Sequence, residues 1–352
     1  MLDIDEILKD AFFKNASDIH LTAGSPPIYR INGNLVRIGE EKLLPDTIQN
    51  FAKAITSDFL YKKLLELGEV DFSYSVKGLS RFRVNAFKQR GSIAIAFRVI
   101  AQEIPKFESL GLPTVIKEFT KYNKGLVLVT GPTGSGKSTT LASIIDIINE
   151  ERNLHIITLE DPIEYLHRHK QSVVNQREIG SDSISFAAAL RSALREDPDV
   201  ILVGEMRDLE TISIALTAAE TGHLVFSTLH TIGAAKTIDR IIDVFPPHQQ
   251  QQVRVQLSTV LNAVVSQQLL TIRGGKGRVV ATEIMIANPA VRNLIRESKT
   301  YQVQSIIQTN TKNGMITMEQ SLIDLYKRGL ITREDCYLYA NDQESMSKML
   351  LY

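Results

Sequence analysis

Apolar residues recur at two different spacings in the first hundred residues of the chain. From residue 2 to residue 15 they follow the helical period and predict a short amphipathic helix, which Ser17 and Asp18 are expected to end. Over residues 80–87 apolar and polar residues alternate, which is typical of a strand with one buried face. Further strands are expected at 28–31, 35–38, 71–76 and 92–99, and a helix is expected at 51–67. This mixture predicts a small α+β domain over residues 1–100.

The pattern changes after residues 101–113, where Pro105, Gly111 and Pro113 indicate a linker. Continuous apolar runs then alternate with helical segments, which is typical of a mostly parallel sheet in an α/β domain. The expected strands are 125–130, 155–159, 200–203 and 224–227, with a helix at 138–149. From about Pro246 onward the pattern favours helices. A second domain is therefore predicted over residues 114–352, with a helical C-terminal region.

Composition narrows the classes of protein to consider. The 352 residues include 40 basic and 40 acidic side chains, and this zero net charge argues against a protein that coats DNA or RNA. Cys336 is the single cysteine, so neither an intrachain disulfide nor a cysteine-based zinc site is expected, and we expect it to be buried. No apolar run approaches the ~18–20 residues that span a bilayer. The acidic N-terminus is unlike a secretory signal, and a cytosolic protein is expected.

A glycine-rich loop follows the apolar strand 125–130 and opens the next helix. Its residues are Gly131, Pro132, Thr133, Gly134, Ser135, Gly136, Lys137, Ser138 and Thr139, a match to the Walker A pattern at every specified position. Small residues let backbone N–H groups turn towards nucleotide phosphates, and the helix N-terminus adds positive potential. Lys137 is expected to reach the β- and γ-phosphates, and the Ser138 hydroxyl is expected to bind Mg²⁺. The sequence thus predicts ATP and Mg²⁺ as ligands.

Carboxylates and histidines follow or flank the other predicted strands. The strand 200–203 ends in Gly204 and Glu205, a Walker B arrangement in which glycine stands where the usual aspartate would be. Glu205 is therefore the expected magnesium-side carboxylate, either directly or through a water, and Glu160 and Glu164 follow the strand 155–159. The strand 224–227 lies between His223 and His230, which are candidate sensors of the nucleotide state, although either alone is more often structural.

These motifs together resemble the PilT-type retraction ATPases of type IV pili, in the secretion ATPase superfamily. The matching segments are the Walker A loop at 131–139, an aspartate box at 157–165, an atypical Walker B at 193–208 and a histidine box at 221–231. The glycine at 204 is normal in this family. The resemblance covers essentially the whole chain and implies a PAS-like N-terminal domain followed by a RecA-like motor, assembled as a homohexamer with ATP between the domains.

The resemblance also implies roles for individual residues. Glu205 would activate water with Glu164 as its companion, and His223 and His230 would couple hydrolysis to motion. Arginines of the N-terminal domain would contribute positive charge to the γ-phosphate of a neighbouring subunit, and the candidates are Arg81, Arg83 and Arg98. Arginines that alternate along a strand are also explained by a solvated face alone.

Retraction of the pilus and twitching motility are the functions that the resemblance implies. The expected partners are an inner-membrane platform protein of the PilC type and a second retraction ATPase. The protein would then act at the cytoplasmic face of the inner membrane, reach the membrane only peripherally through partners and bind no nucleic acid.

Three alternatives stay open. Pilus-assembly and type II secretion ATPases share these boxes, but they generally carry a four-cysteine zinc element and a longer N-terminal region. The single cysteine, and the segment 290–297, which is similar to a segment of the retraction family, favour retraction. A RecA-type nucleic-acid motor is disfavoured by the balanced charge and the lack of an aromatic and basic track. A weakly active regulatory subunit of a retraction complex is the third alternative.

Overall fold

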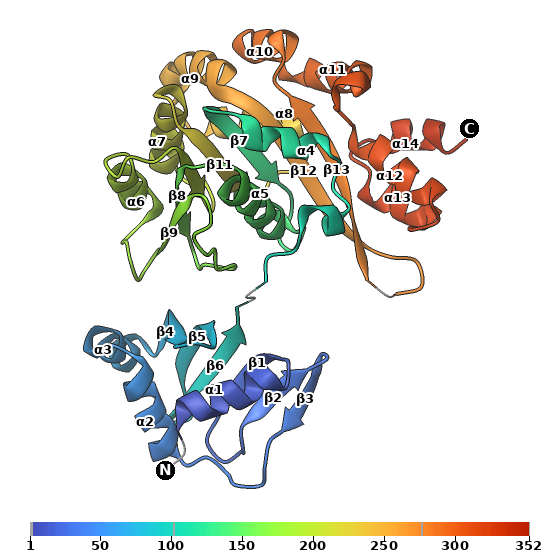
Figure 1. Cartoon of the computed structure of the whole chain (residues 1–352). Coiled ribbons are helices and arrows are strands. Elements are labelled where there is room, and N and C mark those ends of the chain that lie inside the picture. The colour runs from blue at the N-terminus through green and yellow to red at the C-terminus, as the bar shows by residue number, and fades with distance from the viewer. Residues whose placement is uncertain (1–2, 101–102, 276, 352) are drawn as a thin grey trace. The chain divides into compact units, whose positions relative to one another are not determined.

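The computed structural model describes residues 3–100, 103–275 and 277–351 (Figure 1). The chain divides into one unit of residues 1–103 with 164–166 and a second unit of residues 104–163 and 167–352. Leu2 of the predicted first helix and residues 101 and 102 of the predicted linker lie outside the described residues. The predicted α/β fold with an α+β N-terminal region is confirmed.

The first unit is a six-stranded antiparallel sheet in the order β3-β2-β1-β6-β5-β4. Its elements are α1 (Ile4–Phe13), β1 (Ala16–Leu21), β2 (Ile28–Ile31), β3 (Asn34–Arg37), α2 (Pro45–Ile55), α3 (Asp58–Leu67), β4 (Glu69–Val76), β5 (Ser80–Gln89) and β6 (Ser92–Val99). Alternate strand residues such as Ile19, Val84 and Phe97 face a core that they share with Ile7 of α1 and Ile48 of α2. The other face of β5 carries Arg81, Arg83 and Asn85.

Two predictions for this unit were wrong. Ser17 and Asp18 were expected to end the first helix, but the helix already ends at Phe13 and both residues lie within β1, where Asp18 pairs with Arg98 of β6. A shift in the pairing register between Ala16 and Asp18 places both polar residues between buried Ala16 and Ile19. The helix expected at 51–67 is two helices, and the second begins after Ser57, whose side chain accepts a hydrogen bond from the Leu60 N–H.

The second unit is built on a seven-stranded sheet in the order β13-β12-β7-β11-β10-β8-β9. Its strands are β7 (Gly125–Thr130), β8 (His155–Glu160), β9 (Val173–Glu178), β10 (Val200–Val203), β11 (Leu224–Leu229), β12 (Leu261–Thr271) and β13 (Arg278–Ile286). All neighbouring strands are parallel except β12 and β13. The carboxyl ends of β7, β8, β10 and β11 therefore meet at one edge, where α/β sheets bind their ligands.

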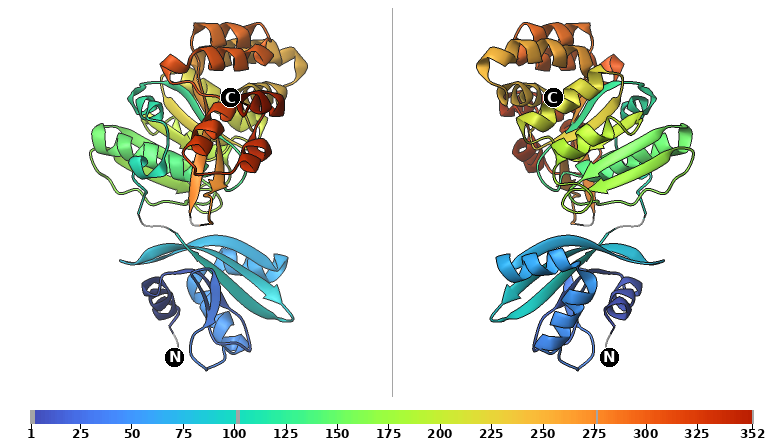
Figure 2. Two further views of the ribbon diagram at one scale, coloured as in Figure 1. Left: turned by 90° about the vertical axis from the view of Figure 1, so that its right-hand side faces the viewer. Right: turned by 90° about the vertical axis from the view of Figure 1, so that its left-hand side faces the viewer.

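Helices cover both faces of this sheet (Figure 2). They are η1 (Phe107–Leu110), α4 (Val115–Glu118), η2 (Phe119–Lys121), α5 (Lys137–Glu151), α6 (Phe186–Ala193), α7 (Leu209–Glu220), α8 (Ala234–Asp243), α9 (Pro247–Val260), α10 (Pro289–Arg296), η3 (Thr300–Gln302), α11 (Val303–Thr309), η4 (Thr311–Asn313), α12 (Met318–Lys327), α13 (Arg333–Tyr339) and α14 (Gln343–Met349). Successive residues of β7 enter opposite cores: Leu126 and Leu128 pack with α7 to α9, whereas Val127 and Val129 pack with α5. Burial on both faces explains the uninterrupted apolar run of this strand.

The expectation that the chain is predominantly helical after Pro246 was wrong in one respect. β12 and β13 pair as an antiparallel hairpin that completes the sheet beside β7. Polar residues obscured β12 in the sequence, but they are buried with partners: Gln267 donates to the Thr140 hydroxyl at 3.0 Å, and Gln268 donates to the Tyr339 carbonyl at 2.8 Å. Strand β9 was likewise not predicted.

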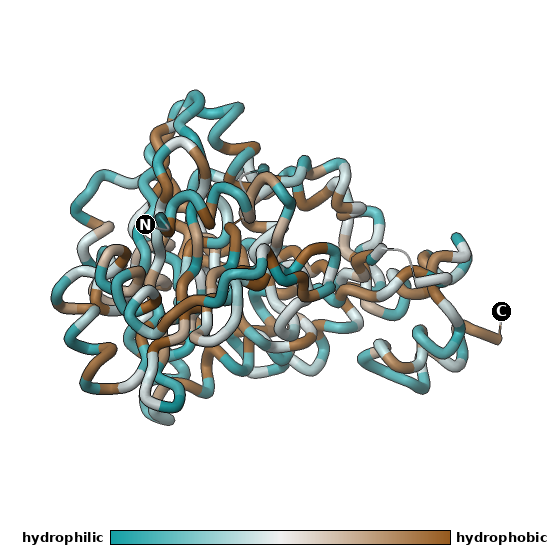
Figure 3. The backbone as a smooth tube through the Cα atoms, turned by 90° about the horizontal axis from the view of Figure 1, so that it is seen from below, coloured by the Kyte–Doolittle hydropathy of each residue, from teal (hydrophilic) through white to brown (hydrophobic). Residues whose placement is uncertain are grey.

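The C-terminal helices α12, α13 and α14 form a separate apolar cluster against Leu270 and Ala281 of the hairpin. Cys336 lies inside this cluster with no exposed surface, which confirms the expectation that it is buried. Hydrophobic and hydrophilic stretches alternate at short intervals along the backbone (Figure 3), and among the described residues no helix is long and apolar enough to cross a membrane.

Candidate nucleotide site

The loop between β7 and α5 is shaped by glycines at its two ends. Gly131 has a φ of +141°, and a Cβ atom there would lie 2.2 Å from the main-chain oxygen of Gln267. Gly136, which precedes the first residue of α5, has a φ of +89° in the left-handed region. A larger residue would clash at the first position and strain the backbone at the second. The chain therefore needs glycine at both ends of the predicted phosphate loop.

Lys137 lies across the inside of this loop. Its Nζ donates hydrogen bonds to the carbonyl oxygens of Gly131 and Pro132, each at 2.9 Å, and its side chain is buried. Within the described part of the chain no side chain caps the N-terminus of α5, whose first residue is Lys137 itself. The positive end of a helix and a buried ammonium group thus converge on one loop, which is the chemistry that binds phosphate.

Glu205 lies two strands away from this loop, at the same edge of the sheet. It follows β10, while His230 follows β11, the strand between β10 and β7. The Nε2 atom of His230 is 3.5 Å from Oε2 of Glu205, and Nε of Arg207 is 2.7 Å from the same oxygen. The Glu205 side chain is 17% exposed, whereas that of Arg207 is 73% exposed. The structure therefore brings the two predicted site residues Glu205 and His230 together and adds Arg207.

The position of Gly204 explains why no aspartate precedes Glu205. A Cβ atom at Gly204 would lie 3.1 Å from the carbonyl oxygen of Leu159 and 3.4 Å from Cα of Glu160. The Gly204 N–H also donates to the Leu159 carbonyl at 2.7 Å, and the Thr228 hydroxyl donates to the Gly204 carbonyl at 2.6 Å. The backbone of β8 thus occupies the space that a side chain at 204 would need.

The two other candidate carboxylates lie at the end of β8 and in the loop after it, and they differ in their surroundings. Glu160 is half-buried, and its Oε1 accepts hydrogen bonds from the Thr158 hydroxyl at 2.6 Å and from Nε2 of Gln176 at 3.1 Å. Glu164 is exposed in the loop that leads to β9. Glu160 is therefore fixed by its neighbours, while the position of Glu164 depends on the loop that carries it.

His223 lies at the opposite edge of the sheet from His230. It precedes β11, its carbonyl accepts from Gly125 at the start of β7 at 3.0 Å, and its Nδ1 is 2.9 Å from the carbonyl of Ala218. Within one chain the structure does not bring His223 to the phosphate loop, because the whole length of β11 separates the two histidines. A coupling role for His223 stays a prediction.

The three candidate arginines share one face of the first unit. Arg81 and Arg83 alternate with buried Phe82 and Val84 on β5, and Arg83 pairs with Arg98 of β6 across the sheet. Nε of Arg98 donates to Asp18 at 2.9 Å. Burial raises the pKa of Asp18, but hydrogen bonds from Ser17 and Arg98 outweigh it, and the pKa lies below its ordinary value. Arg98 therefore already holds a carboxylate within its own unit.

Sequence reasoning did not select Arg207 or Gln176, which contact Glu205 and Glu160 respectively. A weak signal for Arg207 was its place two residues after Glu205, beyond the end of an apolar strand. Nothing marked Gln176, because the strand that carries it was not predicted.

Comparisons with known proteins agree with this architecture. The family model described as type II/IV secretion system protein matches residues 1–336. The type IV pilus retraction ATPase PilT of Pseudomonas aeruginosa is 52% identical over 334 residues, covering 95% of this chain and 97% of that protein. A twitching motility protein of Neisseria gonorrhoeae is 52% identical, covering 91% of this chain and 86% of the relative.

A solved structure supports the same relationship. The crystal structure of the pilus retraction motor PilT with bound ADP has a TM-score of 0.92 and 55% identity, and it covers 99% of this chain and 100% of that one. The resemblance to retraction ATPases is thereby confirmed. The chain belongs to the type II/IV secretion system protein family, in which PilT retraction ATPases are among its relatives.

Proposed function

We propose that this chain is an ATPase that couples ATP hydrolysis to the retraction of type IV pili and so to twitching motility. The observation that carries the proposal is the edge of the sheet at which the phosphate loop, Glu205 and His230 meet, in a chain that covers nearly all of a retraction ATPase at 52% identity. Comparison with pilus-assembly and type II secretion ATPases supports retraction over those functions. Relatives of those two classes are only 34–36% identical, and the chain covers only 46–49% of their length.

The residues of the loop would bind the nucleotide phosphates. Lys137 would exchange its bonds to the Gly131 and Pro132 carbonyls for bonds to phosphate oxygens, and the N–H groups at the start of α5 would bind the same group. The ADP bound in the similar PilT structure supports a nucleotide at this loop.

Mg²⁺ fits the oxygen donors of the site. In the described part of the chain no group of three or more His, Cys, Asp or Glu side chains could hold a metal. Mg²⁺ needs no such cage, because it is commonly held by one or two protein oxygens together with substrate phosphates and waters. Ser138 in the first turn of α5 would supply its hydroxyl, and Glu205 would act through water. The ion would neutralise charge on the transferring phosphoryl group.

Glu205 would orient the attacking water and accept its proton. Arg207 and His230 hold one oxygen of this carboxylate, so its orientation is set before a nucleotide arrives. Glu164 and Glu160 would complete the acidic edge, and His223 with His230 would transmit the nucleotide state. Arg81, Arg83 and Arg98 would contribute positive charge to the γ-phosphate bound by a neighbouring subunit.

The motion that the protein would drive and its place in the cell are inferred from the similarity to PilT. A homohexamer acting on a platform protein, at the cytoplasmic face of the inner membrane, would convert successive hydrolysis steps into extraction of pilin. A second ATPase would be a partner, and the similarity of this chain to the PilU ATPase of Pseudomonas aeruginosa, 38% identical over 99% of this chain, supports this. A nucleic-acid motor remains the alternative from another class.

The test is steady-state ATP hydrolysis by the purified full chain. We expect Mg²⁺-dependent turnover that chelation abolishes, and we expect Lys137→Ala to lose both turnover and nucleotide affinity. Stimulation by DNA would favour the nucleic-acid motor, and absence of turnover in the wild type would favour a regulatory subunit. In the organism, deletion should leave pili that extend but do not retract.

A further inference from the structure

The segment that carries Glu164 is held on both sides by side chains of β9. The main-chain N–H of Ile163, directly before Glu164, donates to Oε2 of Glu178 at 3.2 Å. The main-chain N–H of His167 donates to Oε1 of Gln176 at 2.8 Å. Glu164 therefore lies in a stretch of three residues whose two ends are both fixed to the same strand.

The register of β8 and β9 explains why one strand can hold both ends. Gln176 pairs with Thr158, and Glu178 pairs with Glu160, so that all four side chains lie on one face near the carboxyl edge of the sheet. Glu178 is 3% exposed. Gln176 is the centre of a hydrogen-bond chain, because its Nε2 donates to Glu160 at 3.1 Å while its Oε1 accepts from His167. These two partners fix the orientation of its amide group.

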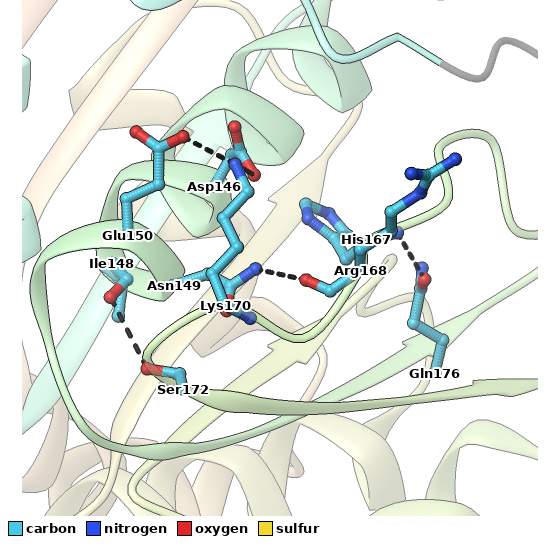
Figure 4. A network of polar contacts seen from close by, with 9 residues as sticks. All are labelled: Asp146, Ile148, Asn149, Glu150, His167, Arg168, Lys170, Ser172 and Gln176. Carbon is cyan, nitrogen blue, oxygen red and sulfur yellow. Dashed lines mark hydrogen bonds and ion pairs between the residues drawn. The ribbon is translucent and has the colours of Figure 1, made fainter.

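The end of the same loop is fastened to the helix of the phosphate site (Figure 4). The fully buried Asn149 of α5 donates from Nδ2 to the Arg168 carbonyl at 2.7 Å and accepts at Oδ1 from the Lys170 N–H at 3.1 Å. Nζ of Lys170 is 2.7 Å from Asp146 and 2.6 Å from Glu150. Since α5 begins at Lys137, the loop is linked to the element that would bind phosphate.

We propose that Gln176 and Glu178 are positioning residues that hold the Glu164 carboxylate in place for the hydrolysis step. An exposed carboxylate on a loop samples many orientations unless its backbone is fixed, and a displacement of about 1 Å can cost ~100-fold in rate. Here the fixing bonds come from side chains of β9, and Gln176 also ties the backbone at His167 to the Glu160 carboxylate. This inference rests on the proposed ATPase function and on the proposed role of Glu164.

A purely structural role for these bonds would have a different signature. If Gln176 only stabilised the loop, its loss would act equally with or without the Glu164 carboxylate. If it acts through Glu164, its loss should have no further effect once that carboxylate has been removed. A double-mutant cycle between the two residues separates the two cases.

The experiment measures kcat and KM for ATP in the full chain for wild type, Glu164→Gln, Gln176→Leu and the double variant. We expect Gln176→Leu to lower kcat by about 10- to 100-fold with KM changed less than about threefold, and the double variant to match Glu164→Gln. Gln176→Asn keeps the amide group, but its side chain is too short to bond to both Glu160 and His167. It replaces the leucine variant in the experiment if that variant does not fold. Asn175→Ala on the same strand, whose amide lies 2.8 Å from His155, is the matched control and should keep the wild-type kcat.

Multiplied losses in the double variant would overturn the inference, because Gln176 would then act independently of Glu164. A Glu164→Gln variant with wild-type turnover would also overturn it, since no catalytic carboxylate would need positioning. Both results leave the proposed ATPase function intact. Failure of that function would be evident separately, as absence of turnover in the wild type.

Discussion

The Nε atom of Arg207 lies 2.7 Å from Oε2 of Glu205, and both side chains come from the short segment that follows β10. His230 approaches the same oxygen at 3.5 Å from the end of the neighbouring strand. Both contacts are therefore made to the same carboxylate oxygen of Glu205.

Replacement of Glu205 by glutamine should remove the proton acceptor while keeping the shape of the side chain. We expect kcat for ATP hydrolysis to fall by about 100-fold or more, with nucleotide affinity nearly unchanged, because the phosphate loop is untouched. Steady-state hydrolysis and an equilibrium binding assay with a fluorescent nucleotide would measure the two quantities. Glu210→Gln, which breaks only an exposed ion pair with Arg191, is the matched control. Undiminished hydrolysis in Glu205→Gln would contradict the role assigned to this residue.

Introducing the missing Walker B carboxylate at Gly204 should destabilise the protein and not improve its activity. Gly204 has no left-handed φ, so the backbone itself would accept another residue. The obstacle is space, since a Cβ would lie 3.1 Å from the Leu159 oxygen. We expect Gly204→Asp to cost about 1–3 kcal/mol, seen as a lower midpoint of thermal unfolding. An unchanged midpoint together with faster hydrolysis would show that the site tolerates the carboxylate.

The sequence predicted best those elements whose residues face a single kind of environment. β7 is buried on both faces and reads as an uninterrupted apolar run, and the loop after it must contain glycines for steric reasons at 131 and 136. Both could be recognised without tertiary information. The strands that bring Glu205 and His230 together could be recognised for the same reason, because β10 and β11 are also fully buried.

The elements that could not be predicted depend on partners far away in the chain. β12 buries Gln267, whose Nε2 donates to the hydroxyl of Thr140 of α5, 127 residues earlier. β9 is an edge strand with a mixed pattern, and its contribution to the site, Gln176, acts through bonds to Glu160 and to the backbone of His167. Local periodicity carries no information about such long-range pairing.

His167 should make the stability of the protein depend on pH. Burial lowers its pKa to about 4, with Lys170 adding to the shift and Asp146 opposing it. The same histidine in the unfolded chain has an ordinary pKa near ~6.5. Between pH about 4 and ~6.5 it is therefore protonated in the unfolded chain but not in the native state. The free energy of unfolding should therefore fall as pH is lowered from about 6.5 towards 4, by about 2 kcal/mol between pH ~7.5 and ~5.

The measurement is the midpoint of urea unfolding as a function of pH. His167→Gln should show a flatter pH dependence than the wild type, whatever its stability at neutral pH. His248→Gln removes an exposed histidine of α9 and should keep the wild-type dependence. Equal pH dependence in wild type and His167→Gln would mean that other groups cause the acid sensitivity.

Arg292 should stabilise the segment 290–297 through hydrogen bonds inside the protein. This effect does not depend on any partner that binds the outer face of the segment. Its Nε donates to the Ala287 carbonyl at 2.9 Å, and its Nη1 donates to the carbonyls of Ser258 and Thr259, in the last turn of α9, at 2.6 and 2.5 Å. The last carbonyl groups of a helix accept no hydrogen bonds from within the helix. The guanidinium group therefore supplies the donors that these carbonyls of α9 lack. Val291 and Ile295 are buried, and Arg296 is exposed.

Arg292→Met keeps the apolar stem but removes these hydrogen bonds and the one that Nη2 donates to Oδ1 of Asn262, and it should cost about 1–3 kcal/mol of stability. Arg296→Met, one turn along the same helix, should change stability by less than about 0.5 kcal/mol because its charge lies in solvent. Thermal midpoints and ATP hydrolysis of both variants would be compared. If α10 acts as a docking face for a partner, Arg296→Met should impair retraction in cells while hydrolysis and stability stay normal. An Arg292→Met variant as stable as the wild type would contradict the capping role, because the carbonyls of α9 would then be satisfied without it.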